Sequence, residues 1–222
     1  QIIYKIKVQR YYQIIILAAT SMFQMTCIAA PMSYKGSNTT MVDISQEYSK
    51  IDTSYAITAK DSLGIRLYQA KGEGYKLNGD EFYYLRRLHR INAIESQANL
   101  WLFTSAGIVN VKKNNRNNNQ AYVSPTVQAD YETRRIYMMG SYQLFRVAND
   151  NFDTSKFKAG FSFYKTSYEE TQPWFILELS HFNTINKKIE VIPTLRLINK
   201  ALYFEAGVST EGDPKLHLMY TF

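Results

Sequence analysis

Apolar and polar residues alternate along most of the chain from about residue 38 to residue 222. The last segment shows this pattern clearly, with His217, Met219 and Thr221 on one face and Leu216, Leu218, Tyr220 and Phe222 on the other. A period of two residues is that of a β-strand, in which successive side chains point to opposite faces. The pattern therefore predicts an all-β chain whose strands each have one apolar and one polar face.

Twelve such segments follow one another along the chain. They lie near residues 38–45, 47–58, 63–72, 81–91, 98–110, 120–132, 136–147, 155–166, 173–182, 188–198, 201–209 and 215–222. An even count places both ends of an up-and-down sheet on the same side. Two links, 92–97 and 167–172, are long for tight turns, so ten strands remain an alternative count.

The apolar faces can meet either a protein core or lipid. In a soluble sandwich or barrel the apolar face is buried, whereas in a transmembrane barrel it meets lipid and the polar face lines the lumen. Many of the segments run about 10–12 residues, which suits tilted membrane strands, and soluble strands more often run about 5–6 residues. Because every backbone group in hydrocarbon must be paired, a spanning sheet must close on itself. We therefore expect a transmembrane antiparallel β-barrel.

The links between segments alternate in character. One set is tight and includes 59–62, 133–135 and 199–200. The other set is longer and polar, and comprises 73–80, 112–120, 148–154 and 211–215. Short turns at the periplasmic side and longer loops outside are typical of outer-membrane barrels. We expect this arrangement here.

The first thirty residues have the pattern of an export signal. Lys5, Lys7 and Arg10 precede an apolar run over 14–19, and small residues follow at 27–30. A positive start, a short apolar run and a small-residue end are typical of a secretory signal peptide. We predict a signal peptide over 1–29, cleaved after Ala29, and a barrel over 30–222. A single membrane-anchoring helix is the alternative.

Composition changes this picture in three ways. The mean hydropathy of −0.31 argues against a bundle of transmembrane helices. The whole chain has a formal net charge of +7, but removal of 1–29 leaves 23 basic and 19 acidic residues, hence +4. This weak excess gives little support to nucleic-acid binding. The single cysteine, Cys27, lies in the signal segment, so disulfides and cysteine metal sites are not expected.

The final strand carries a resemblance to a known family. Leu216, Leu218, Tyr220 and Phe222 form one apolar face that ends in an aromatic residue. This resembles the C-terminal assembly signal of Gram-negative outer-membrane barrels. The segments 159–164 and 172–176 also resemble uncharacterised proteobacterial barrels. The resemblance implies an outer-membrane location and contact with lipid and the barrel-assembly machinery, and it implies no particular function.

Deletion of Phe222 provides a test of the assembly signal. We expect the deletion to impair membrane insertion far more than substitution of any asparagine in 114–119, because those asparagines lie in a polar link. The measurement is the fraction of each variant recovered as folded barrel in the outer membrane. Equal insertion of the two variants would contradict the proposed role of the last strand.

The polar face predicts what lines the lumen. It carries arginines and carboxylates in similar number, namely Arg66, Arg86, Arg90, Arg196, Asp130, Glu178, Glu190 and Glu205. These charges either pair and stabilise the wall or form opposed ladders that orient a passing solute. Arg86 and Arg87 are adjacent, so one of them points outward unless a bulge intervenes. We assign Arg86 to the lumen and Arg87 to the interface, where it could snorkel.

Catalytic and metal chemistry have little support in the sequence. The chain has three histidines, His89, His181 and His217. Ser180 and His181 are neighbours and face opposite sides of a strand, so they cannot pair directly. No spacing brings together a nucleophile, a base and an orienting group, and His217 with Met219 supplies only two ligands. We therefore expect no enzyme, no cofactor and no metal site.

Taken together, these patterns predict an exported outer-membrane barrel, most simply one of twelve strands. The mixed charges of the lumen favour a narrow passive channel for small polar or charged solutes. The alternative is a non-conducting structural or surface-interaction barrel. A barrel enzyme is the third and weakest hypothesis.

Overall fold

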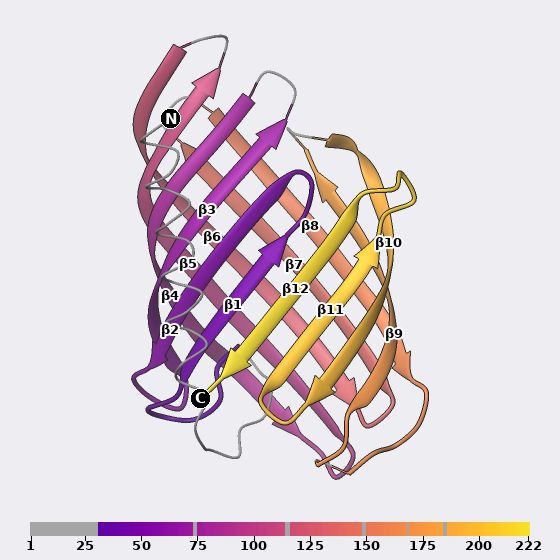
Figure 1. The fold of residues 1–222 in the computed structure, drawn as a ribbon. Coiled ribbons are helices and arrows are strands. Elements are labelled where there is room, and N and C mark those ends of the chain that lie inside the picture. The colour runs from indigo at the N-terminus through magenta and orange to yellow at the C-terminus, as the bar shows by residue number, and fades with distance from the viewer. Residues whose placement is uncertain (1–30, 73–74, 114–115, 148–149, 168, 184–185) are drawn as a thin grey trace, which may run out of the picture.

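Twelve antiparallel strands form one barrel in the computed structural model (Figure 1). The structure describes residues 31–222 except 73–74, 114–115, 148–149, 168 and 184–185. The strands are β1 (Asn38–Ile44), β2 (Tyr48–Ala56), β3 (Asp61–Gly72), β4 (Tyr75–Asn92), β5 (Ser96–Lys113), β6 (Arg116–Thr133), β7 (Ile136–Val147), β8 (Asp150–Ser162), β9 (Gln172–Phe182), β10 (Asn186–Asn199), β11 (Leu202–Val208) and β12 (Pro214–Thr221). The predicted count of twelve is confirmed, and each predicted segment corresponds to one strand.

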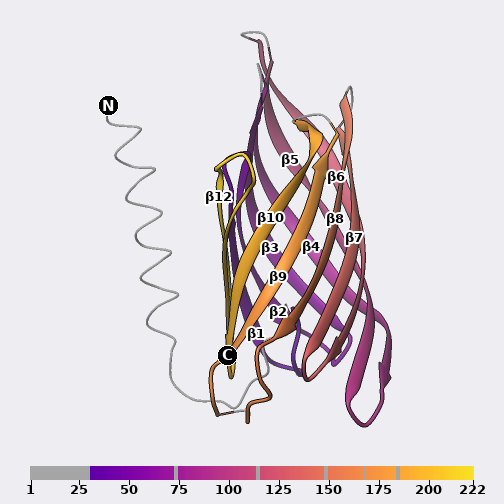
Figure 2. The same cartoon turned by 90° about the vertical axis from the view of Figure 1, so that its right-hand side faces the viewer.

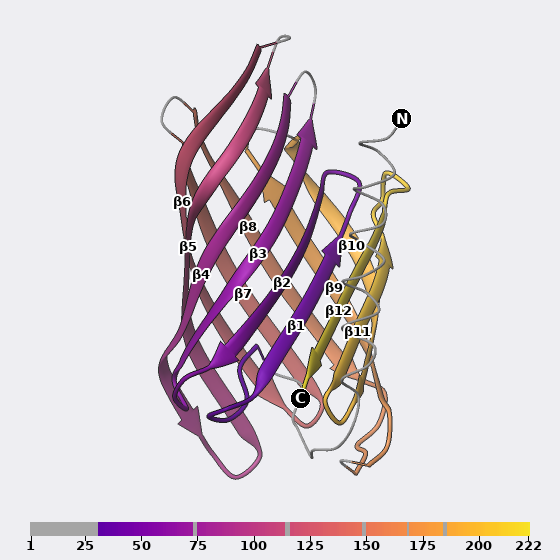
Figure 3. The same ribbon diagram turned by 60° about the vertical axis from the view of Figure 1, so that its left-hand side comes forward.

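Strands β1 and β12 close the barrel. Each strand pairs with its sequence neighbours, and β1 pairs with β12 in antiparallel register, with Val42 opposite Leu218 (Figure 3). The seam continues at the barrel rim, where the backbone amides of Asn38 and Phe222 each donate to the other's carbonyl at 2.7 and 2.9 Å. We call this rim the terminal end. The sheet has no free edge along the seam, as a sheet in hydrocarbon requires.

The outer surface of the barrel is apolar and the lumen is polar. Outward side chains such as Leu63, Phe82 and Ile108 are 53%, 78% and 63% exposed. Inward neighbours in the same alternation, among them Asp52 and Glu178, are buried. This is the reverse of a soluble barrel and matches an apolar belt that faces lipid.

No helix in the described part of the chain is long and apolar enough to cross a membrane. The predicted signal peptide over 1–29 lies outside the described residues. The strands run from Asn38 to Thr221, and the division between a signal peptide and a barrel at residue 30 stays a prediction.

The predicted tight links are found at the terminal end, where 134–135 separate β6 from β7 and 200–201 separate β10 from β11, but the prediction of long polar loops at the other end is wrong. At the end opposite the termini, β3 ends at Gly72 and β4 begins at Tyr75, and β5 and β6 are separated only by 114–115. The longest link, 163–171, lies at the terminal end instead. The polar stretches continue the strands instead of forming loops. Cross-strand hydrogen bonds between their side chains stabilise a hairpin in water, and one example is Asn110 Nδ2 donating to Asn119 Oδ1 at 2.7 Å. Strands β5 and β6 therefore rise beyond their neighbours (Figure 2).

Candidate functional site

An aromatic cluster lies in the lumen near the end opposite the termini. Its rings come from different strands and contact one another in series. The ring of Phe145 stacks on Tyr68 with centroids at 5.6 Å and on Phe152 at 4.7 Å, and Phe182 lies tilted against Phe152 at 5.7 Å. Tyr48 packs against the same cluster. We call these five residues the aromatic plug; with the buried Tyr122 and the buried aliphatic residues around them they draw on consecutive strands from β2 to β9.

Local sequence explains the centre of the plug. Phe145 and Phe152 lie near the ends of β7 and β8 and face each other across that hairpin. Both fall on the inward parity of their strands, where the other residues are mostly polar. An aromatic pair in directly opposite cross-strand positions stabilises a hairpin. The plug is therefore an apolar cluster on an inner face that also carries many polar and charged side chains.

A buried ion-pair network lies between the plug and the terminal end, on strands β8 to β12. Glu205 accepts a hydrogen bond from Lys158 Nζ at 2.6 Å and another from Arg196 Nε at 2.9 Å. Glu178 pairs with Lys158 at 3.4 Å and with Lys215. Both carboxylates are almost completely buried, so the network binds the wall together and neutralises their charge. We call this set the Glu205 network.

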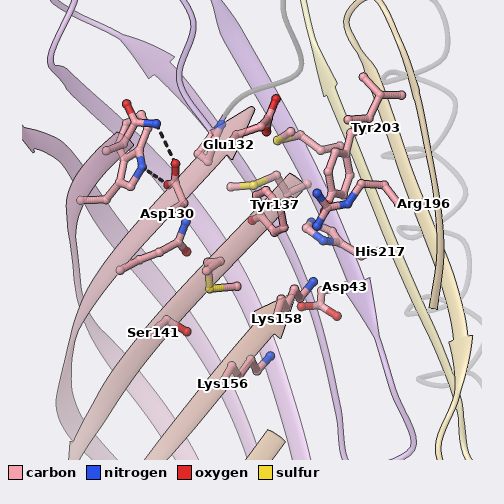
Figure 4. Close-up of a pocket in the computed structure, with 18 of the residues that line it drawn as sticks. Asp43, Asp130, Glu132, Tyr137, Ser141, Lys156, Lys158, Arg196, Tyr203 and His217 are labelled. Carbon is pink, nitrogen blue, oxygen red and sulfur yellow. Dashed lines mark hydrogen bonds between the residues drawn. The ribbon is translucent and has the colours of Figure 1, made fainter. Parts of the chain in front are cut away.

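Arg196 lies between two aromatic rings within this network. Its guanidinium carbon is 3.9 Å from the centroid of Tyr137 and 4.9 Å from that of Tyr203. His217 approaches the same carboxylate, with Nδ1 at 3.7 Å from Glu205 Oε2. Figure 4 shows Arg196, Tyr137, Tyr203 and His217 gathered on one side of the lumen.

A second ion-pair unit lies on the wall formed by β2, β3 and β4. Arg66 Nε donates to Asp52 Oδ2 at 3.1 Å, and Arg66 Nη1 is 3.7 Å from Glu81 Oε2. The guanidinium also lies 4.7 Å from the centroid of the Tyr83 ring. Arg66 is therefore a buried structural cation.

Asp130 is held by neutral donors. Asn99 Nδ2 donates to Asp130 Oδ1 at 2.7 Å, and Trp101 Nε1 donates to Asp130 Oδ2 at 2.6 Å (Figure 4). Arg90 Nε donates to Asn99 Oδ1 at 2.7 Å, so Arg90 reaches the carboxylate only through the amide. Strands β4, β5 and β6 thus place a chain of hydrogen-bonded side chains on one wall of the lumen.

The prediction that Arg86 lines the lumen is wrong. The β4–β5 register shifts between Arg87 and His89, so a bulge occurs at this point of β4. Between the plug and the bulge, the odd-numbered residues of β4 face inward. Arg86 therefore lies on the outer surface, where its Nη1 is 3.4 Å from Asp61 Oδ1. Arg87 lies inward, 5.9 Å from the centroid of the buried Trp101 ring. The bulge then restores Arg90 to the lumen.

The predicted opposed ladders are absent from the described residues. Arg66 and Arg196 pair directly with carboxylates, and Glu178 pairs with lysines. Glu190 lies on the inward parity of β10, opposite the buried Ser180. Arg66, Arg196, Glu178 and Glu205 therefore form local pairs in the wall instead of two facing rows.

A cavity of about 380 Å³ occupies the lumen between the plug and the terminal end. Its rim includes Ser167 and Glu170 of the long link 163–171 and the exposed Lys200, so it opens at the terminal end. Its inner end is lined by Gln143, Thr154 and other residues next to the plug. The cavity is wide enough for a small molecule with several polar groups.

Several lining residues were not among the predicted site residues. Asp43, Lys156 and Lys215 all line the cavity. The alternation of side chains along a strand predicts an inward position for two of them. Lys156 lies two residues before the inward Lys158, and Lys215 lies two residues before His217. Their partners could not be read from parity, since pairing depends on the closure of β12 onto β1.

The histidines show no catalytic arrangement in the described part of the chain. Ser180 faces the lumen and the adjacent His181 lies on the other parity, as predicted. His217 contacts Glu205 and the Tyr203 ring. The described residues contain no group of three His, Cys, Asp or Glu side chains that could hold a metal ion. That the protein is not an enzyme stays a prediction.

Comparison with known proteins gives likenesses of fold alone. No family model and no curated protein matches the chain. Among solved structures, the chain is similar to a KdgM porin in complex with disordered oligogalacturonate, at 12% identity and a TM-score of 0.47, over 84% of this chain and 99% of that one. It is also similar to LpxR from Salmonella typhimurium, at 9% identity and a TM-score of 0.42, over 84% and 99% of the two chains. These likenesses assign neither an activity nor a solute to this chain.

Proposed function

We propose that the protein is a narrow passive channel for small polar or charged solutes in the outer membrane of a Gram-negative bacterium. The observation that carries this proposal is the cavity of about 380 Å³, whose lining includes many charged and polar side chains and which opens at the terminal end and runs inward to the aromatic plug. A barrel that only needed a stable wall would gain by filling this space with packed side chains.

The aromatic plug provides the gate of the proposed channel. An apolar constriction excludes water and ions without any covalent barrier, and it opens when its side chains move apart. In the described conformation these rings pack against one another near the end opposite the termini. Strands β10 to β12 and β1 contribute no ring to the plug and carry Lys215 and Asp43 beside the cavity. The solute path therefore runs between the rings and this ionic wall.

Truncation of a plug ring tests the gate. We expect Phe152→Ala to give a several-fold rise in single-channel conductance, because it removes a buried ring that stacks on Phe145. The matched control is Phe157→Ala on the same strand, whose ring is 42% exposed on the outer surface. Conductance is measured in planar bilayers with both refolded variants and the wild type. No single-channel steps from any folded form would remove the channel from consideration.

The alternative function is a non-conducting structural or surface-interaction barrel. The Glu205 network favours it, because most of the inward charge on β8 to β12 is already paired within the wall. In that case the Phe152→Ala barrel would give no single-channel steps in planar bilayers, and the substitution would only lower the stability of the barrel.

The outer-membrane location is part of the same proposal. The apolar outer surface supports contact with membrane lipid, and the final strand with Tyr220 and Phe222 supports recognition by the barrel-assembly machinery.

A further inference from the structure

A compact patch of polar side chains forms the inner wall of the cavity next to the plug. Ser141 lies directly opposite Lys156 across the β7–β8 hairpin, and Gln143 lies directly opposite Thr154. All four line the cavity. The next inward pair toward the opposite end is Phe145 and Phe152 of the plug. Two cross-strand pairs therefore place four polar groups side by side on an apolar floor; Figure 4 shows Ser141 and Lys156 on their neighbouring strands.

Lys156 is half-buried and differs from Lys158 and Lys215 in its partners. Lys158 and Lys215 each pair with carboxylates. Lys156 Nζ donates to the hydroxyl of Tyr48 at 2.6 Å and lies 4.7 Å from the centroid of that ring. Within the described ranges, no carboxylate lies within ion-pair distance of its ammonium group. Two of its three N–H donors are thus left for other acceptors.

The neighbours of Lys156 also have unused hydrogen-bonding capacity. The hydroxyl of Thr154 is buried and has no hydrogen-bond partner among the described residues. Gln143 Nε2 donates to Ser124 Oγ at 2.8 Å, which uses one of its two N–H groups. A buried polar group without a partner costs free energy, so such a cluster favours a bound molecule that satisfies it.

The charge around the patch is positive. One set of contacts joins Lys50 and Lys156 to Asp43, the latter through the hydroxyl of Tyr48. The Glu205 network joins Lys158, Arg196 and Lys215 to Glu178 and Glu205. The two sets together contain five cations and three carboxylates. The other lining carboxylates lie nearer the terminal end, Asp130 and Glu132 on β6 and Glu170 in the link 163–171. A positive excess inside a low-dielectric lumen favours an anion at this point.

We propose that Lys156, Ser141, Thr154 and Gln143 bind the oxyanion group, a carboxylate or a phosphate, of a small solute. Lys156 supplies the charge, and the two hydroxyls and the amide supply directional hydrogen bonds. Asp43 Oδ1, which is buried and has no hydrogen-bond partner among the described residues, accepts a hydroxyl or amine of the same solute. This inference names the solute class and rests on the proposed channel function for the transport step alone.

Acetate and acetamide provide the direct test, since the two molecules have the same shape and differ in charge. We expect refolded barrel in detergent to bind acetate or inorganic phosphate, and not acetamide, by isothermal titration calorimetry. Lys156→Met should weaken that binding by about tenfold or more, as expected for the loss of a charge-assisted hydrogen bond. Lys156→Arg should retain it. The matched control is Lys200→Met at the exposed rim, where Lys200 pairs with Glu169, and it should bind as the wild type does.

The outcomes separate the site from the channel. Equal acetate affinity in the wild type and Lys156→Met, or equal binding of acetamide, would overturn the oxyanion site. If Lys156→Met does not fold, Thr154→Val gives the same test without a change of charge, and undiminished binding would again overturn the site. Acetate binding by a barrel that shows no conductance would support the site and contradict the channel. Under a salt gradient, a reversal potential that favours anions in the wild type and moves toward zero in Lys156→Met would support both.

Discussion

Replacement of Leu177 by arginine is expected to lower the free energy of unfolding of the barrel in a bilayer by about 2–4 kcal/mol, the cost of a basic side chain at the lipid-facing midplane. Leu177 lies at the centre of β9, opposite Ala159 and Pro193, and it is 41% exposed on the outer surface. Urea titration of barrels refolded into vesicles measures the change.

The matched substitution is Ile94→Arg. Ile94 is fully exposed in the short link between β4 and β5 at the terminal end, where an arginine side chain can remain in water. We expect it to have little effect on the same titration. If both arginines had the same small effect, the apolar belt would not face lipid, and the whole assignment to the membrane would fail.

Replacement of Glu205 by glutamine is expected to destabilise the barrel by about 3–5 kcal/mol, because it leaves buried cations without their counter-charge. Glu205 accepts from both Lys158 and Arg196, and all three side chains are buried. Glutamine keeps the size of the side chain and removes its charge. Thermal unfolding followed by loss of heat-modifiable migration on a gel, together with urea titration, measures the effect.

Glu169→Gln is the control for the buried network. Glu169 pairs with Lys200 at the exposed rim, where ion pairs contribute little to stability because water screens them. The same chemical change should therefore be nearly neutral there. A Glu205→Gln barrel as stable as the Glu169→Gln barrel would mean that the buried pairs can be exchanged for neutral contacts without cost.

The strands could be predicted from the sequence because each has a physical reason to alternate. In β9, for example, Leu177 and Leu179 meet the outer medium while Glu178 and Ser180 face the lumen. The link lengths could not be predicted in the same way. A polar stretch such as 112–120 is equally compatible with a loop in water and with a hairpin whose two faces are both in water. The structure extends β5 and β6 through most of it.

The composition of the lumen was largely predictable, but its pairing was not. Parity places Arg66, Arg196, Glu178 and Glu205 inward, and the structure agrees. Parity fails at Arg86, because a single bulge in β4 moves the alternation by one residue. The alternation also does not predict which charged side chains pair, since Lys158 and Glu205 become neighbours only when the sheet closes into a cylinder.

The short links at the end opposite the termini have a consequence for how the protein meets the outside of a cell. Proteases, antibodies and phage tail proteins engage exposed loop tips, which are the segments of a barrel easiest to cleave or grip. Here β3–β4, β5–β6 and β7–β8 are each joined by two residues, and the nine-residue segment 163–171 lies at the other rim. A barrel oriented with its termini toward the periplasm would therefore offer the environment mostly paired backbone, and little for such agents to recognise.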